Sequence, residues 1–121
     1  YGTASFDDCL ADLIQKYPSV HFTYFQSNIE GEIVDAIQKA GFEQDGIIIN
    51  PAAYTHTSVA IGDAIAAIQT KVIEVHISNV HAREDFRKIS HVSSKVVGSI
   101  VGLGLQGYAL ATEWFVSNAN K

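Results

Sequence analysis

Short runs of apolar and β-branched residues, separated by helical patterns, constrain the fold of this chain more than any other feature. Residues 46–49 are followed by Asn50 and form a continuously apolar run, which is typical of a strand buried on both faces. Residues 71–76 and 95–101 resemble it in composition. Strands that alternate with helices of ~10–15 residues predict βαβ units and a parallel sheet.

Hydrophobic periodicity and residues that cap or end helices predict the remaining elements. Apolar residues at helical spacing predict helices over residues 4–17, 58–69, 83–89 and 105–118. Another helix is expected to begin after a cap at Asn28 and to stop at Gly41, and Thr57 or Ser58 is expected to cap the helix that follows. Residues 20–25 are aromatic and β-branched, so they predict a strand. Residues 1–121 contain no repeat or linker, and we interpret them as a single domain.

The order of these elements predicts an α/β fold, a flavodoxin-like three-layer sandwich. Its strand order would be 2-1-3-4-5, in which the first strand is internal. The chain opens with a helix instead, so a strand at residues 20–25 would lack its inner neighbour. We therefore expect a first strand upstream of residue 1, with the domain N-terminally incomplete in this sequence.

Composition narrows the classes of partner and compartment. The chain is 47% hydrophobic and 17% charged, as expected of a globular protein, and its net charge of −5 disfavours nucleic acid. No apolar run approaches the ~20 residues of a membrane span, and no signal peptide is visible. Cys9 is the one cysteine, which fits a reducing compartment. We predict a cytoplasmic protein that binds neither nucleic acid nor membrane.

Glu74 and His76 are the strongest candidates for chemistry. They end an apolar strand, and residues two apart in a strand share a face. A carboxylate beside an imidazole orients the ring and favours its protonated form, which suits a proton donor. An ordinary surface pair is the competing interpretation, but the apolar residues around them favour a deliberate pair.

Other polar groups follow the same two strands, where open α/β sheets build their sites. Asn50 precedes Pro51, and turn formation alone explains that pair. His56 lies at an expected helix start, where a capping or surface role is the simpler interpretation. The backbone N–H groups of Ile77 and Ser78, with the serine hydroxyl, could hold an anion, although a turn explains them nearly as well.

Further sequence patterns are weak evidence for a functional site. Arg83 and Arg87 share a helix face, but solvated charges are the default interpretation. The five histidines form neither HxxxH nor HExxH, so no metal site is predicted. No GxSxG elbow occurs. Residues 102–107 match GxGxxG literally, but they end the last strand without an acidic partner downstream, and we interpret them as helix–sheet packing.

Four segments give the chain a strong resemblance to type II 3-dehydroquinate dehydratase. The similarity covers nearly the whole sequence, and the second and third segments are highly specific. The segments are FQSNIEGE (25–32), IINPAAYTHTS (48–58), IEVHISNVHAREDFR (73–87) and GLGLQGY (102–108). In the family a Gly-Pro-Asn-Leu-Asn motif and a loop arginine would precede Tyr1. Gly62 stands where many relatives have arginine, at an inter-subunit contact.

The resemblance implies dehydration of 3-dehydroquinate to 3-dehydroshikimate, in the shikimate pathway or in quinate catabolism. The route is an anti-elimination through an enolate, with no Schiff base, cofactor or metal. Tyr1, as tyrosinate, would be the base, and the Ala53 N–H would help to hold a water against the enolate oxygen. His76, oriented by Glu74, would protonate the leaving hydroxyl, which Asn50 would help to bind.

The resemblance also implies the contacts that bind the substrate. Ile77 and Ser78 would hold its carboxylate, and His56 and Arg87 would bind its ring hydroxyls. Asp63 would reach into the site of a neighbouring subunit within a homotrimer, and four trimers would form a dodecamer.

Two other functions remain open at this point. A phosphoacceptor signalling domain has the same topology, but it needs an aspartate where this chain has Asn50. An inactive relative that only assembles is the second alternative. Appearance of a conjugated enone when 3-dehydroquinate is added would separate both from the enzyme.

Overall fold

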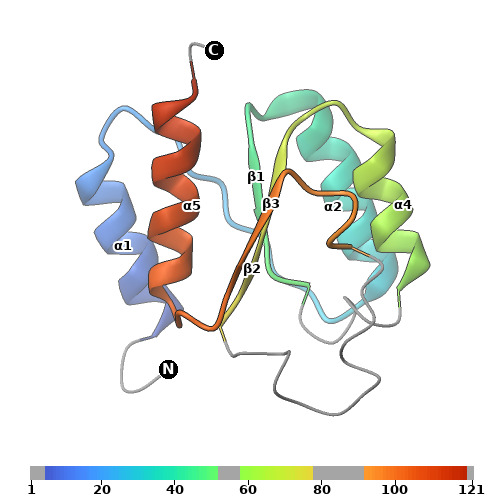
Figure 1. Ribbon diagram of the computed structural model, residues 1–121, viewed down its shortest axis with the longest axis horizontal. Coiled ribbons are helices and arrows are strands. Elements are labelled where there is room, and N and C mark those ends of the chain that lie inside the picture. Colours follow the sequence, from blue (N-terminus) through green and yellow to red (C-terminus); the bar gives the residue numbers. More distant parts are fainter. Residues whose placement is uncertain (1–4, 52–57, 78–91, 120–121) are drawn as a thin grey trace.

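The computed structural model describes residues 5–51, 58–77 and 92–119, and these form a parallel sheet between two helical layers (Figure 1). Strands β1 (Ile47–Ile49), β2 (Val72–His76) and β3 (Gly98–Val101) are neighbours in that order and run in one direction. Helices α1 (Phe6–Lys16) and α5 (Gln106–Ser117) cover one face, and α2 (Glu30–Glu43) and α4 (Val59–Ala67) cover the other. The predicted three-layer α/β fold is confirmed, whereas the upstream first strand of the order 2-1-3-4-5 stays a prediction.

The alternation of side chains along β2 divides the core in two. Ile73 and Val75 pack with Ala111 of α5 on one face of the sheet. Val72 joins the opposite cluster, whose other buried members come mainly from β1, α2 and α4: Ile37, Ile49, Ile61, Ala64, Ile65 and Val92. Because residues two apart in a strand share a face, Glu74 and His76 belong to the face of Val72.

The helix ends follow the sequence only in part. Ser58 caps α4 as predicted, since its Oγ accepts a hydrogen bond from the Ile61 N–H at 3.0 Å. The expected cap at Asn28 is wrong: Ile29 occupies the cap position of α2 and makes no side-chain cap bond. Gly41 does not stop this helix either. A Cβ there would lie 2.5 Å from Ile68 Cγ2, so the glycine permits close packing.

The predicted strand at residues 20–25 is wrong. These residues lie in neither helix nor strand, because no described strand offers them a backbone ladder. The last strand begins at Gly98 rather than at Lys95, whose N–H closes a turn onto the Val92 carbonyl. The expected helix at 83–89 falls outside the described residues. Among the helices of the described part, none is long and apolar enough to cross a membrane.

Gly107 joins α5 closely to the sheet, as its place in the GxGxxG sequence predicts. A Cβ there would lie 2.9 Å from Cγ1 of Val75, which is wholly buried, and 3.4 Å from Ile100 Cγ2. Gly107→Ala is therefore expected to lower the free energy of unfolding by about 1–3 kcal/mol through overpacking. Gly31 is the matched control, because it is also the second residue of its helix and nothing lies within 4 Å of its added Cβ.

Gly31→Ala should be neutral, or stabilising by up to about 1 kcal/mol, because alanine restricts the unfolded chain more than glycine does. Urea unfolding of both variants measures the difference. Equal stabilities for the two variants would contradict the tight contact at Gly107.

Candidate active site

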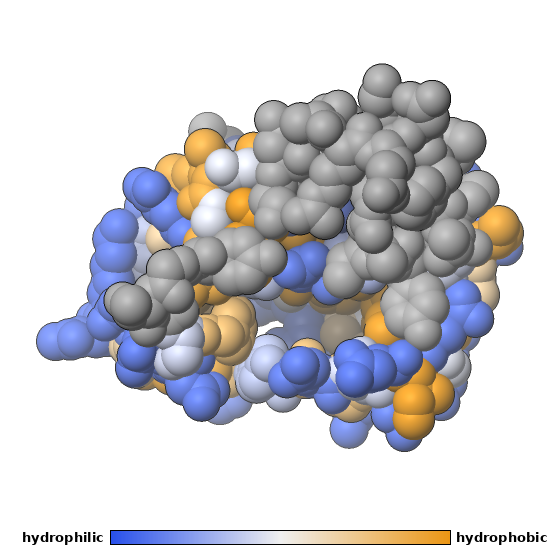
Figure 2. All heavy atoms as spheres, turned by 90° about the horizontal axis from the view of Figure 1, so that it is seen from below, coloured by the Kyte–Doolittle hydropathy of each residue, from blue (hydrophilic) through white to orange (hydrophobic). Residues whose placement is uncertain are grey.

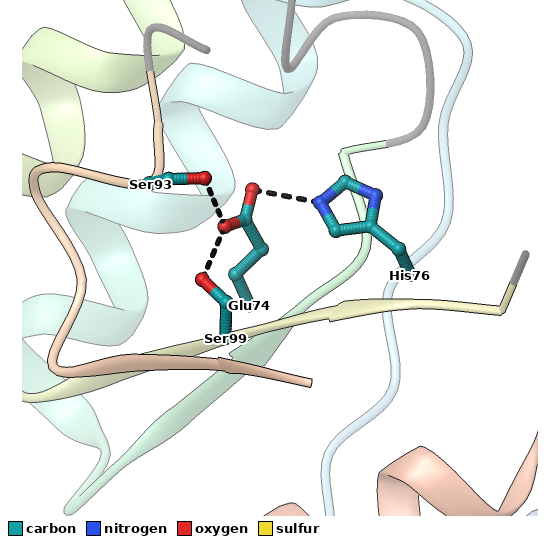
Figure 3. Close-up of polar contacts among 4 residues, drawn as sticks. All are labelled: Glu74, His76, Ser93 and Ser99. Carbon is teal, nitrogen blue, oxygen red and sulfur yellow. Dashed lines mark hydrogen bonds and ion pairs between the residues drawn. The ribbon is translucent and has the colours of Figure 1, made fainter. Parts of the chain in front are cut away.

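The carboxyl end of β2 carries a buried carboxylate–imidazole pair. Glu74 is wholly buried and His76 is 5% exposed, and the Nε2 of His76 lies 2.8 Å from the Oε2 of Glu74 (Figure 3). The second ring nitrogen points away from Glu74. The predicted pairing of the two residues is confirmed.

Two serines complete the surroundings of the carboxylate. Ser93 Oγ and Ser99 Oγ donate hydrogen bonds to the same oxygen, Glu74 Oε1, at 2.6 and 2.7 Å (Figure 3). Ser99 lies beside Glu74 because the parallel register pairs these two positions of β2 and β3. Sequence reasoning missed both serines, since the register between strands cannot be read from periodicity.

These contacts decide the charge of Glu74. Burial raises the pKa of its carboxyl group, but hydrogen bonds from His76, Ser93 and Ser99 and the charge of His76 outweigh burial, so the pKa lies below its usual value. Glu74 is therefore a carboxylate at neutral pH. A fixed anion against Nε2 orients the imidazole, and an imidazole held in one orientation is suited to act as a general acid.

Asn50 lies directly after β1, and its Nδ2 donates to the Tyr108 hydroxyl of α5 at 3.2 Å. Burial, with Cys9 and Tyr24 nearby, raises the Tyr108 pKa against the opposing effect of the Asn50 bond, so the phenol stays neutral. Phe6 packs edge-on to the Tyr108 ring, with centroids 5.1 Å apart. Tyr108 was not predicted as a site residue, although it closes the segment 102–108.

The glycine-rich segment after β3 donates backbone hydrogen bonds to the end of β2. The N–H of Gly102 donates to the His76 carbonyl, and that of Gly104 donates to the Ile77 carbonyl, both at 3.0 Å. Their φ angles of 84° and 63° lie in the left-handed region that favours glycine. These bonds fix the chain direction after His76.

The three strands end on one side of the molecule, and that side is hollowed near its middle (Figures 1 and 2). Hydrophilic side chains lie along part of the rim and within the hollow. Acid–base groups and a depression therefore occur at the same end of the sheet, as expected for an open α/β fold.

The remaining predicted site residues are placed as follows. Asp63 is exposed on α4, between neighbours that are buried. In the described part of the chain, no three His, Cys, Asp or Glu side chains gather to hold a metal ion. Outside the described residues lie Tyr1, Ala53, His56, Ser78, Arg83 and Arg87.

Comparisons with known proteins agree with this geometry. A family model described as "Dehydroquinase class II" matches residues 1–116. The chain is 51% identical to the 3-dehydroquinate dehydratase of Fusobacterium nucleatum, with 100% of the chain and 86% of that protein covered. It is 50% identical to the catabolic 3-dehydroquinase of Aspergillus clavatus, with 98% and 80% covered.

Solved structures give the same likeness. The type II dehydroquinase of Propionibacterium acnes superposes with a TM-score of 0.88 at 40% identity, covering 96% of this chain and 87% of that one. The enzyme of Butyrivibrio crossotus gives a TM-score of 0.88 at 45% identity, with 96% and 83% covered.

Proposed function

The chain belongs to the class II dehydroquinase family and removes water from 3-dehydroquinate to give 3-dehydroshikimate, and we propose that His76 is the acid that protonates the departing hydroxyl. The observation that carries this role is the buried Glu74–His76 pair, 2.8 Å apart at the carboxyl end of β2. A type II enzyme forms no Schiff base. The reaction belongs to the shikimate pathway or to quinate catabolism, and we place it in the cytoplasm.

In this proposal the elimination has two steps. Tyr1, as tyrosinate, removes a proton from the carbon next to the substrate ketone, and the electrons move onto the ketone oxygen as an enolate. A water held by the Ala53 N–H donates to that oxygen. The enolate then expels the hydroxyl at C1, which takes a proton from His76 and leaves as water. Asn50 hydrogen-bonds the same hydroxyl.

In the same proposal, backbone and side-chain groups around the reacting carbons hold the substrate. Its carboxylate accepts hydrogen bonds from the N–H groups of Ile77 and Ser78, and its ring hydroxyls bind His56 and Arg87. The hydrogen bond from the Gly104 N–H to the Ile77 carbonyl supports this assignment, because it holds the backbone of Ile77, whose N–H is the first proposed donor. The chemistry uses no metal or organic cofactor.

Two assays test the reaction and its class. Addition of 3-dehydroquinate should produce the ultraviolet absorbance of a conjugated enone. Borohydride added with the substrate should neither inactivate the enzyme nor add mass. Lys71 immediately precedes β2 and Lys95 comes before β3, so neither follows a strand at the site end. A trapped lysine adduct, or no enone, would overturn the assignment.

We propose a homotrimer in which Asp63 serves the site of a neighbouring subunit, with four trimers in a dodecamer. The outward position of Asp63 on α4 supports this arrangement, because the buried side of the helix faces its own core. Asp63→Ala and His76→Ala subunits, each inactive alone, are expected to regain some activity when mixed. A few sites would then contain unchanged His76 from one chain and unchanged Asp63 from the other.

Mass spectrometry of isotope-labelled subunits verifies that the two variants have exchanged. Two His76→Ala preparations mixed in the same way are the control and should stay inactive. No recovery in verified mixed oligomers would show that each site is built within one chain.

A further inference from the structure

We propose that Ser93 and Ser99 are positioning residues, which hold the Glu74 carboxylate in one orientation so that its other oxygen stays against His76. This inference rests on the proposed role of His76 as the acid. It goes further, because it assigns a role in orienting the acid to two serines that lie outside β2.

The geometry assigns one task to each carboxylate oxygen. Oε1 accepts from both serine hydroxyls, at 2.6 and 2.7 Å, whereas Oε2 has only the contact to His76 Nε2 within the described residues. Two donors on one oxygen fix the plane of the carboxylate, and rotation of that plane would break both bonds. Figure 3 shows the serines on one side of the carboxylate and the imidazole on the other.

Separate structural features place the two hydroxyls. Ser99 is fixed by the register of β2 and β3, which sets it beside Glu74. Ser93 follows Val92, which is wholly buried in the core, and the Lys95 N–H closes a turn onto the Val92 carbonyl at 2.9 Å. Both serines are exposed residues whose hydroxyls point inward to a wholly buried carboxylate. Their removal therefore leaves no large cavity.

In the part of the chain that the structure describes, few ionisable groups lie on the elements around Glu74. Neither flanking strand, β1 or β3, contains an ionisable side chain. On α4 the one such residue is Asp63, which is exposed, and the ionisable residues of α2 are exposed or only partly buried: Glu30, Glu32, Asp35, Lys39 and Glu43. On α5, across the sheet, Tyr108 and Glu113 bond to Asn50 and to Tyr17 and Ser117. Among the described residues, His76 is the charged partner of Glu74.

The first experiment compares Ser93→Ala, Ser99→Ala and the double variant with wild type. Each single change is expected to lower kcat about three- to tenfold and the double change about ten- to hundredfold, on the scale of hydrogen bonds to a charged group. KM should change less than twofold, because both hydroxyls donate to the Glu74 carboxylate. Ser99→Thr keeps the hydroxyl and should restore kcat. Ser94→Ala is the matched control, since Ser94 is exposed and has no bond to Glu74.

The second readout follows Glu74 itself, by carbon-13 NMR of labelled glutamate assigned with Glu74→Gln. Hydrogen bonds to the ionised form lower a carboxyl pKa, so their loss must raise it. In the double variant Glu74 should take up its proton at higher pH than in wild type, and the acidic limb of the kcat profile should move the same way.

Each outcome decides the inference. An unchanged Glu74 titration would show that the serines do not hold the carboxylate. A shifted titration with wild-type kcat would make the serines merely structural. Failure of the proposed function appears separately, as wild-type kcat in His76→Gln. In that case the titration still reports on the serines, but their role in catalysis falls.

Discussion

His76→Ala is expected to lower kcat by about 10²–10⁴, which is the usual contribution of a general acid. Binding should change much less, because the proposed mechanism assigns the ring hydroxyls and the carboxylate of the substrate to other groups. Steady-state assays of enone formation measure the loss. His21→Ala is the control, since His21 is exposed in a segment outside the sheet and its removal should leave kcat unchanged.

Alanine at this position also leaves the Glu74 carboxylate buried without its partner, which lowers stability by itself. His76→Gln separates the two effects. Its amide can still donate to Glu74 but cannot transfer a proton, so the variant should fold better and lose the same factor in kcat. Retention of more than half of wild-type kcat by either variant would overturn the assignment.

Deuterium exchange shows which step has been lost. In the proposed mechanism, proton removal at the carbon beside the ketone precedes departure of the hydroxyl, and His76 acts only in the second step. His76→Gln should therefore still exchange that substrate proton in heavy water, even though elimination is slow. NMR of the recovered substrate detects the exchange. Loss of both exchange and elimination would assign His76 to the first step instead.

The sequence predicted the pairing of Glu74 and His76 but not the rest of their surroundings. Glu74 and His76 are two apart on one apolar strand, so strand periodicity alone places them together. Ser99 is 25 residues from Glu74, and only the register of β2 with β3 brings them side by side. The bond from Asn50 to Tyr108 spans 58 residues and depends on how α5 packs across the sheet. Contacts of this kind follow from tertiary packing, which one sequence does not reveal.

The secondary structure was also predicted only in part, with local features found and features set by tertiary packing missed. Local patterns placed the three strands and the capping role of Ser58, because burial and hydrogen bonding act over a few residues there. They failed at Gly41, where the contact with Ile68 outweighs the usual tendency of glycine to end a helix. They also failed at residues 20–25, because a strand exists only where a neighbour supplies hydrogen-bond partners.

Tyr1→Phe, made in the full-length protein, is expected to keep the fold and the substrate affinity and to lower kcat by about 10²–10⁴. Tyr1 lies outside the described residues, so its role as the base is a proposal from the family resemblance. Phenylalanine keeps the ring but has no oxygen that can accept a proton. Tyr24→Phe is the matched control, because it removes an exposed phenol whose bond is to Gln26, at 3.0 Å.

The exchange experiment separates this residue from His76. A base acts in the first step, so Tyr1→Phe should lose exchange of the substrate proton together with elimination, whereas His76→Gln should lose elimination alone. A tyrosine acts as a base only when a cation or hydrogen bonds stabilise its phenolate. Rapid exchange or normal turnover in Tyr1→Phe would place the base elsewhere, and the proposed mechanism would fail at its first step.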